Sequence, residues 1–271
     1  MYKANNGIIS LSNDLAECKI SLWGGNVLSY RPKNEKYDVF WMGALNKFDN
    51  IQAIRGGVPV CWPRFAEEKL NNNLPRHGFA RLSEWKLENA SVNNDKIEAV
   101  LSLKPDDKYE LCVEAKLFIK INDKLECRLE TINNGNEDFM FSEALHAYFY
   151  VKNRDEVIIK GLAGGEYRNS IDGKFYKSEN DLQITKEFDG AFINHEGKVE
   201  IVDPLLKRTI VVEKEGSRST VVWNPDKDLA EMSEGQYKSF VCVEPANQGD
   251  LFVVVPPKEK HQIVMKVSVK K

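Results

Sequence analysis

Residues 109–131, YELCVEAKLFIKINDKLECRLET, decide the fold that this sequence predicts. Apolar and polar residues alternate up to Asn122-Asp123 and again after this pair, which is the pattern of two strands joined by a tight turn. The residues that would share the apolar face are Leu111, Val113, Ala115, Leu117, Ile119 and Ile121, followed by Leu125, Cys127, Leu129 and Thr131. A hairpin of this kind must bury its apolar face against a second layer.

The same period of two runs through most of the chain. Residues 15–31 alternate on both sides of Gly24-Gly25, and residues 85–103 alternate on both sides of residues 93–95, so each stretch predicts a hairpin. Many short strands separated by turn signals indicate an all-β protein, and we expect a large antiparallel β-sandwich. Further strands are predicted at 138–151, 156–160, 199–202, 208–213, 218–223, 239–244, 251–255 and 261–269.

Helical periodicity is nearly absent. The best candidate is residues 226–234, DKDLAEMSE, which follow Pro225 and predict one or two helical turns. No flexible linker or change of composition divides the chain, so we expect residues 1–271 to form a single domain with few short helices. Asparagines 71–73 predict a solvated loop.

Composition limits the classes of partner. The net charge of −3 does not favour a nucleic acid or an anionic membrane held by bulk electrostatics. No apolar run reaches the length of a membrane helix, and residues 1–14 lack the apolar core of a signal peptide. We expect a cytoplasmic monomer with no nucleic-acid or membrane partner.

The five cysteines (Cys18, Cys61, Cys112, Cys127 and Cys242) are odd in number and form no C-x-x-C pair. This pattern favours free, mostly buried thiols in a reducing compartment over a disulfide framework or a zinc site. The four histidines likewise show no metal-ligand spacing, and we expect no metal.

The stretch from Arg55 to Arg81, RGGVPVCWPRFAEEKLNNNLPRHGFAR, predicts a stiff irregular loop. Gly56-Gly57 allows positive φ or a close backbone approach, and two prolines exclude a regular helix or a central strand. Between its two ends the loop also carries Arg64, Arg76 and His77. Guanidinium groups on a rigid support suit phosphate or carboxylate, although solvated arginines on a Gly/Pro connection are the plain alternative.

His146 lies in the predicted strand SEALHAYFY. Alternate residues share a face, so His146 should point with Ala144 and Tyr148, away from Leu145 and its neighbours. A histidine among aromatic residues is more often a core residue than a catalyst. Here its face is otherwise small and polar, which favours a lined cavity where imidazole can exchange a proton.

Glu244 ends an apolar strand, FVCVE, that Pro245 stops. A carboxylate at such a place is costly unless it is paired, and partial burial would raise its pKa toward the range of a general base. The alternative is a strand-end glutamate that emerges into solvent. Asp189, followed by Gly190, gives only a turn signal, and Trp223 is expected to pack or to stack on a sugar ring.

Sequence motifs for other enzymes are missing from the chain. It has no G-x-S-x-G elbow, no H-E-x-x-H, no Walker loop and no G-x-G-x-x-G. Hydrolase, nucleotidyl-transfer and metalloenzyme activities therefore have no motif support.

Five ordered blocks, IRGGVPVCWPRF, HGFAR, ALHAYF, VVWNP and FVCVEPAN, resemble the hexose-6-phosphate mutarotases of the aldose 1-epimerase superfamily. The blocks run from about residue 54 to residue 247. The resemblance implies the galactose mutarotase-like supersandwich, an activity without cofactor, and hexose 6-phosphates as substrates. It assigns His146 as general acid, entering as imidazolium, and Glu244 as general base.

The resemblance also implies substrate ligands. Arg55 and Arg81 match the family's substrate and phosphate ligands, and His77 would assist near the ring or anomeric oxygen. The chain departs from the pattern at Arg76, where the family often has glutamine, and at Asp189, which lacks the following arginine. Arg76 would therefore add an anion contact or point to solvent, and Asp189 is a weaker candidate for a hydroxyl ligand.

Three alternatives stay open from the sequence. An epimerase of unphosphorylated aldoses would have no need of a cation cluster. A carbohydrate-binding or sugar-phosphate-binding protein without activity would have no need of both His146 and Glu244. A purely structural sandwich would leave the Arg, His and Glu positions unexplained.

Overall fold

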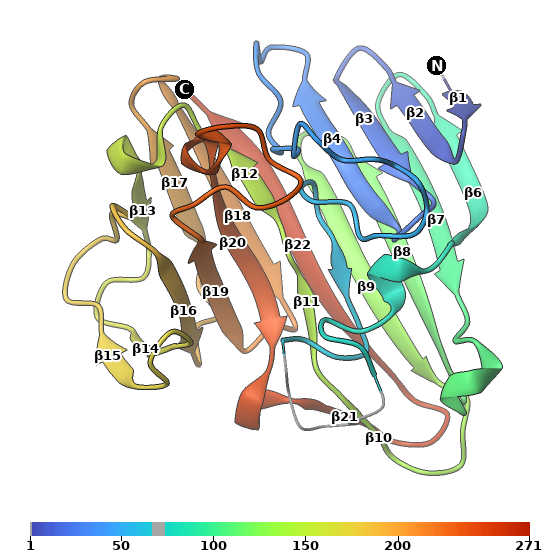
Figure 1. Cartoon of the computed structure of the whole chain (residues 1–271). Helices are drawn as coiled ribbons and strands as arrows, with labels where there is room; N and C mark the ends of the chain where they lie inside the picture. Colours follow the sequence, from blue (N-terminus) through green and yellow to red (C-terminus); the bar gives the residue numbers. More distant parts are fainter. Residues whose placement is uncertain (1, 67–73) are drawn as a thin grey trace.

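Antiparallel sheets dominate the molecule (Figure 1). The computed structural model describes residues 2–66 and 74–271, so the loop predicted at asparagines 71–73 lies outside the described residues. Within these ranges the helices are short 3₁₀ turns, and none is long and apolar enough to cross a membrane. The expected all-β sandwich with few short helices is therefore confirmed.

One eight-stranded sheet contains the hairpin from which the prediction started. Leu117 lies opposite Leu129, and Ile121 lies opposite Leu125 across the tight turn. The long strand β22 runs through the middle of this sheet between β18 and β9 (Figure 1). In spatial order the strands are β13 (Ile158–Lys160), β17 (Val199–Asp203), β18 (Arg208–Glu215), β22 (Lys260–Lys270), β9 (Leu125–Asn133), β8 (Val113–Ile121), β7 (Ile97–Leu103) and β6 (Lys86–Val92).

A second eight-stranded sheet carries the histidine and glutamate blocks. Its central strand β20 pairs with β19 on one side and with both β11 and β12 on the other. The strands are β15 (Phe175–Lys177), β14 (Glu166–Asn169), β16 (Phe188–Ile193), β19 (Ser219–Asn224), β20 (Phe240–Asn247), β11 (Glu143–Leu145) and β5 (Val60–Cys61), with β12 (Tyr148–Tyr150) also on β20.

Smaller elements complete the described fold. A four-stranded sheet is built from β1 (Tyr2–Asn5), β2 (Ile8–Ser12), β3 (Ala16–Ser21) and β4 (Asn26–Pro32), and a two-stranded sheet from β10 (Phe139–Phe141) and β21 (Val253–Val255). The 3₁₀ helices are η1 (Ala80–Leu82), η2 (Asp107–Tyr109), η3 (Arg154–Glu156), η4 (Gln236–Ser239) and η5 (Gly249–Leu251).

The core lies between the sheets. Strand β8 buries every second side chain, and this face joins one large apolar cluster with Val241 and Val243 of β20. All eight residues of β20 are buried, including Cys242 and Glu244 on its other face. Because alternate residues of a strand point to opposite faces, a further layer must cover Cys242 and Glu244.

The Gly-Gly loop lies against this outer face. Gly56 and Gly57 both have positive φ, and a Cβ added at Gly56 would lie 2.3 Å from the carbonyl oxygen of Trp41. At Gly57 an added Cβ would lie 2.5 Å from the carbonyl oxygen of Val27. The predicted stiff loop with close backbone approach is confirmed, since both positions exclude a side chain.

The helix predicted at residues 226–234 is wrong. The segment consists of turns, and a 3₁₀ helix follows at η4. Asp226 has positive φ, and the Asp228 carboxylate accepts hydrogen bonds from the backbone N–H groups of Gly235 and Tyr237. Such side-chain bonds offer the backbone an alternative to helical pairing.

Asp189-Gly190 is also not a turn. Both residues lie inside β16 and pair with Trp223 and Val222 of β19. The glycine serves another purpose, because an added Cβ would come within 2.6 Å of the Phe188 ring. Other strands were not predicted, among them β1, β2, β14 and β15, and the short β14 and β15 are largely exposed without a buried alternating face.

The cysteines agree with the prediction. All five are free, and all but Cys112 are buried. The single domain and the monomeric state stay predictions.

The cross-strand pair Leu117–Leu129 tests the predicted core. Leu117 is 1% exposed, so Leu117→Ala should lower the free energy of unfolding by about 2–5 kcal/mol through lost burial and the cavity left behind. Lys120→Ala, on the exposed side of the same strand, should change it by less than about 0.5 kcal/mol. Urea denaturation followed by circular dichroism measures both, and equal effects would contradict the assignment of faces.

Candidate active site

Strand register brings His146 and Glu244 together. Ala144 pairs with Ala246 and Tyr148 pairs with Cys242 between β20 and the β11–β12 segment. His146 lies in the two-residue gap between β11 and β12, and the same register on both sides of the gap brings it to the level of Glu244. The two side chains lie on the same face of the sheet, where imidazole and carboxylate meet.

The two groups are in contact and buried. Nδ1 of His146 lies 3.1 Å from Oε1 of Glu244, and their side chains are 13% and 1% exposed. The contact is not aligned as a hydrogen bond, and among the described residues neither Nδ1 of His146 nor Oε2 of Glu244 has a hydrogen-bond partner. Buried polar atoms without partners are uncommon in proteins and mark a place where a ligand completes the bonding.

Burial shifts both groups toward their neutral forms. It raises the pKa of Glu244 well above its ordinary value, and the Asp189 charge adds to the increase. For His146, burial and the charges of Arg55 and Arg81 lower the pKa to about 3. The direction of the shift for Glu244 is the expected one, whereas the lowered pKa of His146 disfavours the imidazolium form in which it was expected to enter the reaction.

His77 is fixed as a hydrogen-bond donor. Its Nδ1 accepts a hydrogen bond from the backbone N–H of Ala66 at 3.2 Å, so the proton of the neutral ring must sit on Nε2. Burial and the neighbouring His146 lower the pKa of His77 to about 2, which keeps the ring neutral. The ring centroids of His77 and His146 are 5.9 Å apart.

Arg55 is held in place by two side chains. Its Nε donates to Oε2 of Glu231 at 3.2 Å, and Nη1 donates to the hydroxyl of Tyr148 at 3.2 Å. The Tyr148 ring in turn stacks on His146 with centroids 4.9 Å apart and planes 6° apart. Arg55 is thereby oriented relative to the histidine through a single aromatic ring.

Of the other three arginines, Arg76 and Arg81 line the cavity beside His146 and Arg64 does not. Arg81 donates from Nη2 to the carbonyl oxygen of Arg76, and its buried Nε has no hydrogen-bond partner among the described residues. Arg76 and Arg81 both line the same cavity as His146. Arg64 donates to the carbonyl oxygen of Leu74 and does not line it.

A cavity of about 360 Å³ joins these groups. Segment 51–54 contributes to the wall, while Glu244 is buried next to the lining residue His146. The polar and titratable side chains that line it are Gln52, Arg55, Cys61, Arg76, His77, Arg81, His146, Tyr148 and Glu231.

Trp223 and Asp189, two of the predicted substrate ligands, lie outside the cavity lining. Trp223 meets the rings of His146 and Tyr148 edge-on at 5.8 and 6.0 Å, and it pairs across the sheet with Asp189. Neither residue lines the cavity. Burial raises the pKa of Asp189, and the charge of Arg76 acts against that increase.

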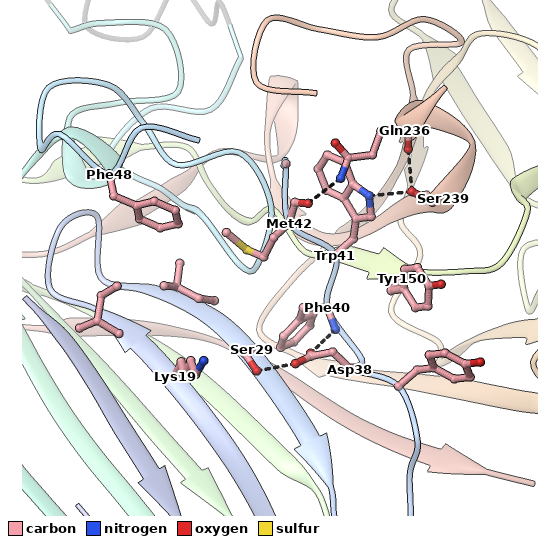
Figure 2. Close-up of a pocket in the computed structure, with 14 residues that line it drawn as sticks. Lys19, Ser29, Asp38, Phe40, Trp41, Met42, Phe48, Tyr150, Gln236 and Ser239 are labelled. Carbon is pink, nitrogen blue, oxygen red and sulfur yellow. Dashed lines mark hydrogen bonds between the residues drawn. The ribbon is translucent and has the colours of Figure 1, made fainter. Parts of the chain in front are cut away.

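A larger cavity of about 650 Å³ lies elsewhere (Figure 2). It shares a wall with the first, because Trp41 lines it and stacks on Tyr148 with centroids 5.7 Å apart. Its polar groups already bond one another: the Asp38 carboxylate accepts from Ser29, and the Trp41 indole donates to Ser239 (Figure 2). The smaller cavity is therefore the better candidate, since Nδ1 of His146 and Nε of Arg81, two residues that line it, lack hydrogen-bond partners among the described residues.

Sequence reasoning missed two members of the site. Glu231 falls in the segment predicted as a helix and carries no local signal for an arginine partner. Tyr148 was placed on the face of His146, but its hydroxyl contact with Arg55 depends on a residue far away in the chain.

Comparison with known families adds an independent observation. Residues 7–268 match the family described as aldose 1-epimerase. The chain belongs to the aldose 1-epimerase family.

Individual relatives agree with this membership. A protein of Cenchrus ciliaris named "Putative glucose-6-phosphate 1-epimerase" is 30% identical over 247 residues, which are 84% of this chain and 74% of that one. A protein of Escherichia coli K12 with the same name is 28% identical over 261 residues, 94% of this chain and 87% of that one. A solved structure described as a "putative mutarotase" from Salmonella typhimurium superposes with a TM-score of 0.90 at 25% identity, covering 100% of this chain and 93% of that one. The galactose mutarotase-like fold expected from the sequence is thus confirmed.

The raised pKa of Glu244 predicts a pH-dependent cost to stability. A carboxyl group that binds its proton more tightly when folded destabilises the fold as pH rises above its ordinary value of 4.5, because the unfolded chain ionises first. Glu244→Gln removes this cost, so the melting temperature of the variant relative to the wild type should rise as the pH increases from about 5 to neutral. Differential scanning calorimetry across this range measures the difference, and a difference that stays constant with pH would contradict the burial argument.

Proposed function

We propose that this aldose 1-epimerase family member interconverts the α and β anomers of hexose 6-phosphates, with glucose 6-phosphate as the principal substrate. The observation that carries the proposal is the buried contact between His146 and Glu244 beside a cavity lined by arginines. The names of the relatives support the choice of a phosphorylated hexose.

The reaction requires an acid and a base at neighbouring oxygens. Opening the ring removes the proton of the C1 hydroxyl and protonates the ring oxygen, and closure on the other face of the aldehyde reverses both transfers. The two oxygens are bonded to the same carbon, so an acid and a base in contact with each other reach both. Glu244 acts as the base and His146 as the acid, and neither step needs a cofactor.

Substrate binding would convert His146 and Glu244 to their charged forms. The shifts favour a protonated carboxyl on Glu244 and a neutral imidazole on His146. Transfer of a proton from Glu244 to Nδ1 of His146, 3.1 Å from the carboxylate oxygen Oε1, gives a carboxylate and an imidazolium. The charges of Arg55 and Arg81 oppose that transfer, and a bound phosphate dianion would neutralise them. The phosphate thereby prepares the acid as well as anchoring the sugar.

The arginines support phosphate recognition by their free donors. Two of Arg55's donor groups are engaged by Glu231 and Tyr148, which leaves the rest of a fixed guanidinium for an anion. The unpartnered Nε of Arg81 offers a second buried donor. A neutral aldose has no use for this cationic wall.

His146→Ala and Glu244→Gln should each reduce mutarotation of glucose 6-phosphate by about 10²- to 10⁴-fold, the usual contribution of general acid–base catalysis. Two-dimensional exchange NMR on the anomeric protons measures the rate directly. Glu213→Gln, an identical substitution at a half-exposed carboxylate paired with Lys124, serves as the control and should keep the wild-type rate. Near-normal rates in both site variants, with a native melting profile, would end the mechanism.

Arg81→Ala should reduce kcat/KM for glucose 6-phosphate more than kcat/KM for free glucose, by at least about tenfold for loss of one charge-assisted contact. Arg31→Ala, a half-exposed arginine of the N-terminal sheet that pairs with Glu17, is the matched control. Equal losses on both sugars would show that Arg81 does not read the phosphate.

A further inference from the structure

Three side chains that bind metals in other proteins converge beside the cavity. A ring nitrogen of His146, Sγ of Cys242 and a carboxylate oxygen of Glu244 all lie within 4.8 Å of one another. Cys242 and Glu244 are two residues apart on β20 and share a face, and the register that places His146 opposite Glu244 places Tyr148 opposite Cys242. The cluster is therefore a direct product of strand pairing.

The ligand atoms of this cluster are buried and incompletely bonded. The side chains of Cys242 and Glu244 are 0% and 1% exposed. Nδ1 of His146 and Oε2 of Glu244 lack hydrogen-bond partners among the described residues. A cation bound between them would bring these lone pairs into use.

We propose that His146, Cys242 and Glu244 form an inhibitory binding site for a zinc ion. The inference rests on the proposed function, because the zinc would occupy the acid and the base of the same reaction. One imidazole nitrogen, one thiolate sulfur and one carboxylate oxygen are a donor set that zinc accepts and that magnesium does not favour. Three protein ligands leave a fourth position for water or a sugar hydroxyl.

The coordinating groups supply negative charge for a dication near the arginines. Zinc binds the thiolate of Cys242 and the carboxylate of Glu244, and protons held by these groups leave to solvent as the ion enters. The two negative charges balance the 2+ charge of the ion, and entry is through the cavity that His146 lines.

Bound zinc would stop mutarotation. It would coordinate the carboxylate oxygen with which Glu244 accepts a proton. It would also coordinate the imidazole of His146, which donates the other proton. Because the sugar must reach the same two groups, zinc and hexose 6-phosphate should exclude each other.

Cobalt(II) tests the site without any assay of activity. The metal-free protein titrated with Co²⁺ under reducing, anaerobic conditions should develop the near-ultraviolet band of a cobalt–thiolate bond. Cys242→Ser should lose this band, whereas Cys61→Ser, which removes the thiol that lines the cavity outside the cluster, should keep it. No band in the wild-type protein, or loss of the band only in Cys61→Ser, would overturn the proposal.

Inhibition of mutarotation by zinc tests the predicted effect of metal binding on activity. Zn²⁺ should inhibit the mutarotation of glucose 6-phosphate competitively, and Mg²⁺ at the same concentration should not. Loss of a residue that only orients a ligand costs about 10- to 100-fold in metal affinity, so Cys242→Ser should raise the inhibition constant for Zn²⁺ by at least as much. An unchanged inhibition constant in Cys242→Ser would contradict the assignment.

The two proposals fail in distinguishable ways. A cobalt–thiolate band in a protein inactive on glucose 6-phosphate would end the proposed function and leave the metal site standing. An active protein with no band would do the reverse. Should Cys242→Ser not fold, anomalous diffraction at the zinc edge from wild-type crystals replaces it: a peak between His146 and Glu244 supports the site, and its absence after soaking in Zn²⁺ overturns it.

Discussion

The antiparallel pairing of β20 with the β11–β12 segment is the constraint on which the site depends. Backbone hydrogen bonds fix the register on both sides of His146, at Ala144–Ala246 and at Tyr148–Cys242. A slip of one residue would turn the side chains of β20 to the other face, and Glu244 would enter the apolar core in place of Val243. The contact between imidazole and carboxylate is thus set by the sheet itself and not by a mobile loop.

The buried carboxyl group of Glu244 lowers the stability of the fold and is also the group proposed to act as the base. A carboxyl group that is 1% exposed, with one oxygen lacking a hydrogen-bond partner among the described residues, destabilises the fold unless it is protonated. The strand tolerates it because the neighbouring apolar residues, Val241 and Val243, are fully buried in the main cluster. The same burial raises the pKa of Glu244 and lowers that of His146, which favours the neutral form of each group in the free site.

The sequence revealed what depends on local pattern. Strict alternation predicted β8 and β9 with their apolar faces, and a polar residue after an apolar run singled out Glu244. The prediction that Pro245 stops this strand is wrong, because β20 continues to Asn247. The sequence also placed His146 on the face of Ala144 and Tyr148, although the residue lies in the short gap between β11 and β12. Prediction from the sequence failed where the outcome depends on distant groups: burial and packed arginines lower the pKa of His146, and Glu231 acquires its role only through Arg55. At residues 226–234 the Asp228 carboxylate binds the backbone and outweighs helical propensity, which no periodicity reports.

A crystal structure with glucose 6-phosphate bound tests the central claim most directly. Our account predicts the sugar in the cavity lined by His146, with its ring oxygen within hydrogen-bond distance of the imidazole, its C1 hydroxyl against Glu244 and its phosphate between Arg55 and Arg81. Binding of the sugar in the larger cavity beside Trp41, or with C1 turned away from Glu244, would contradict it.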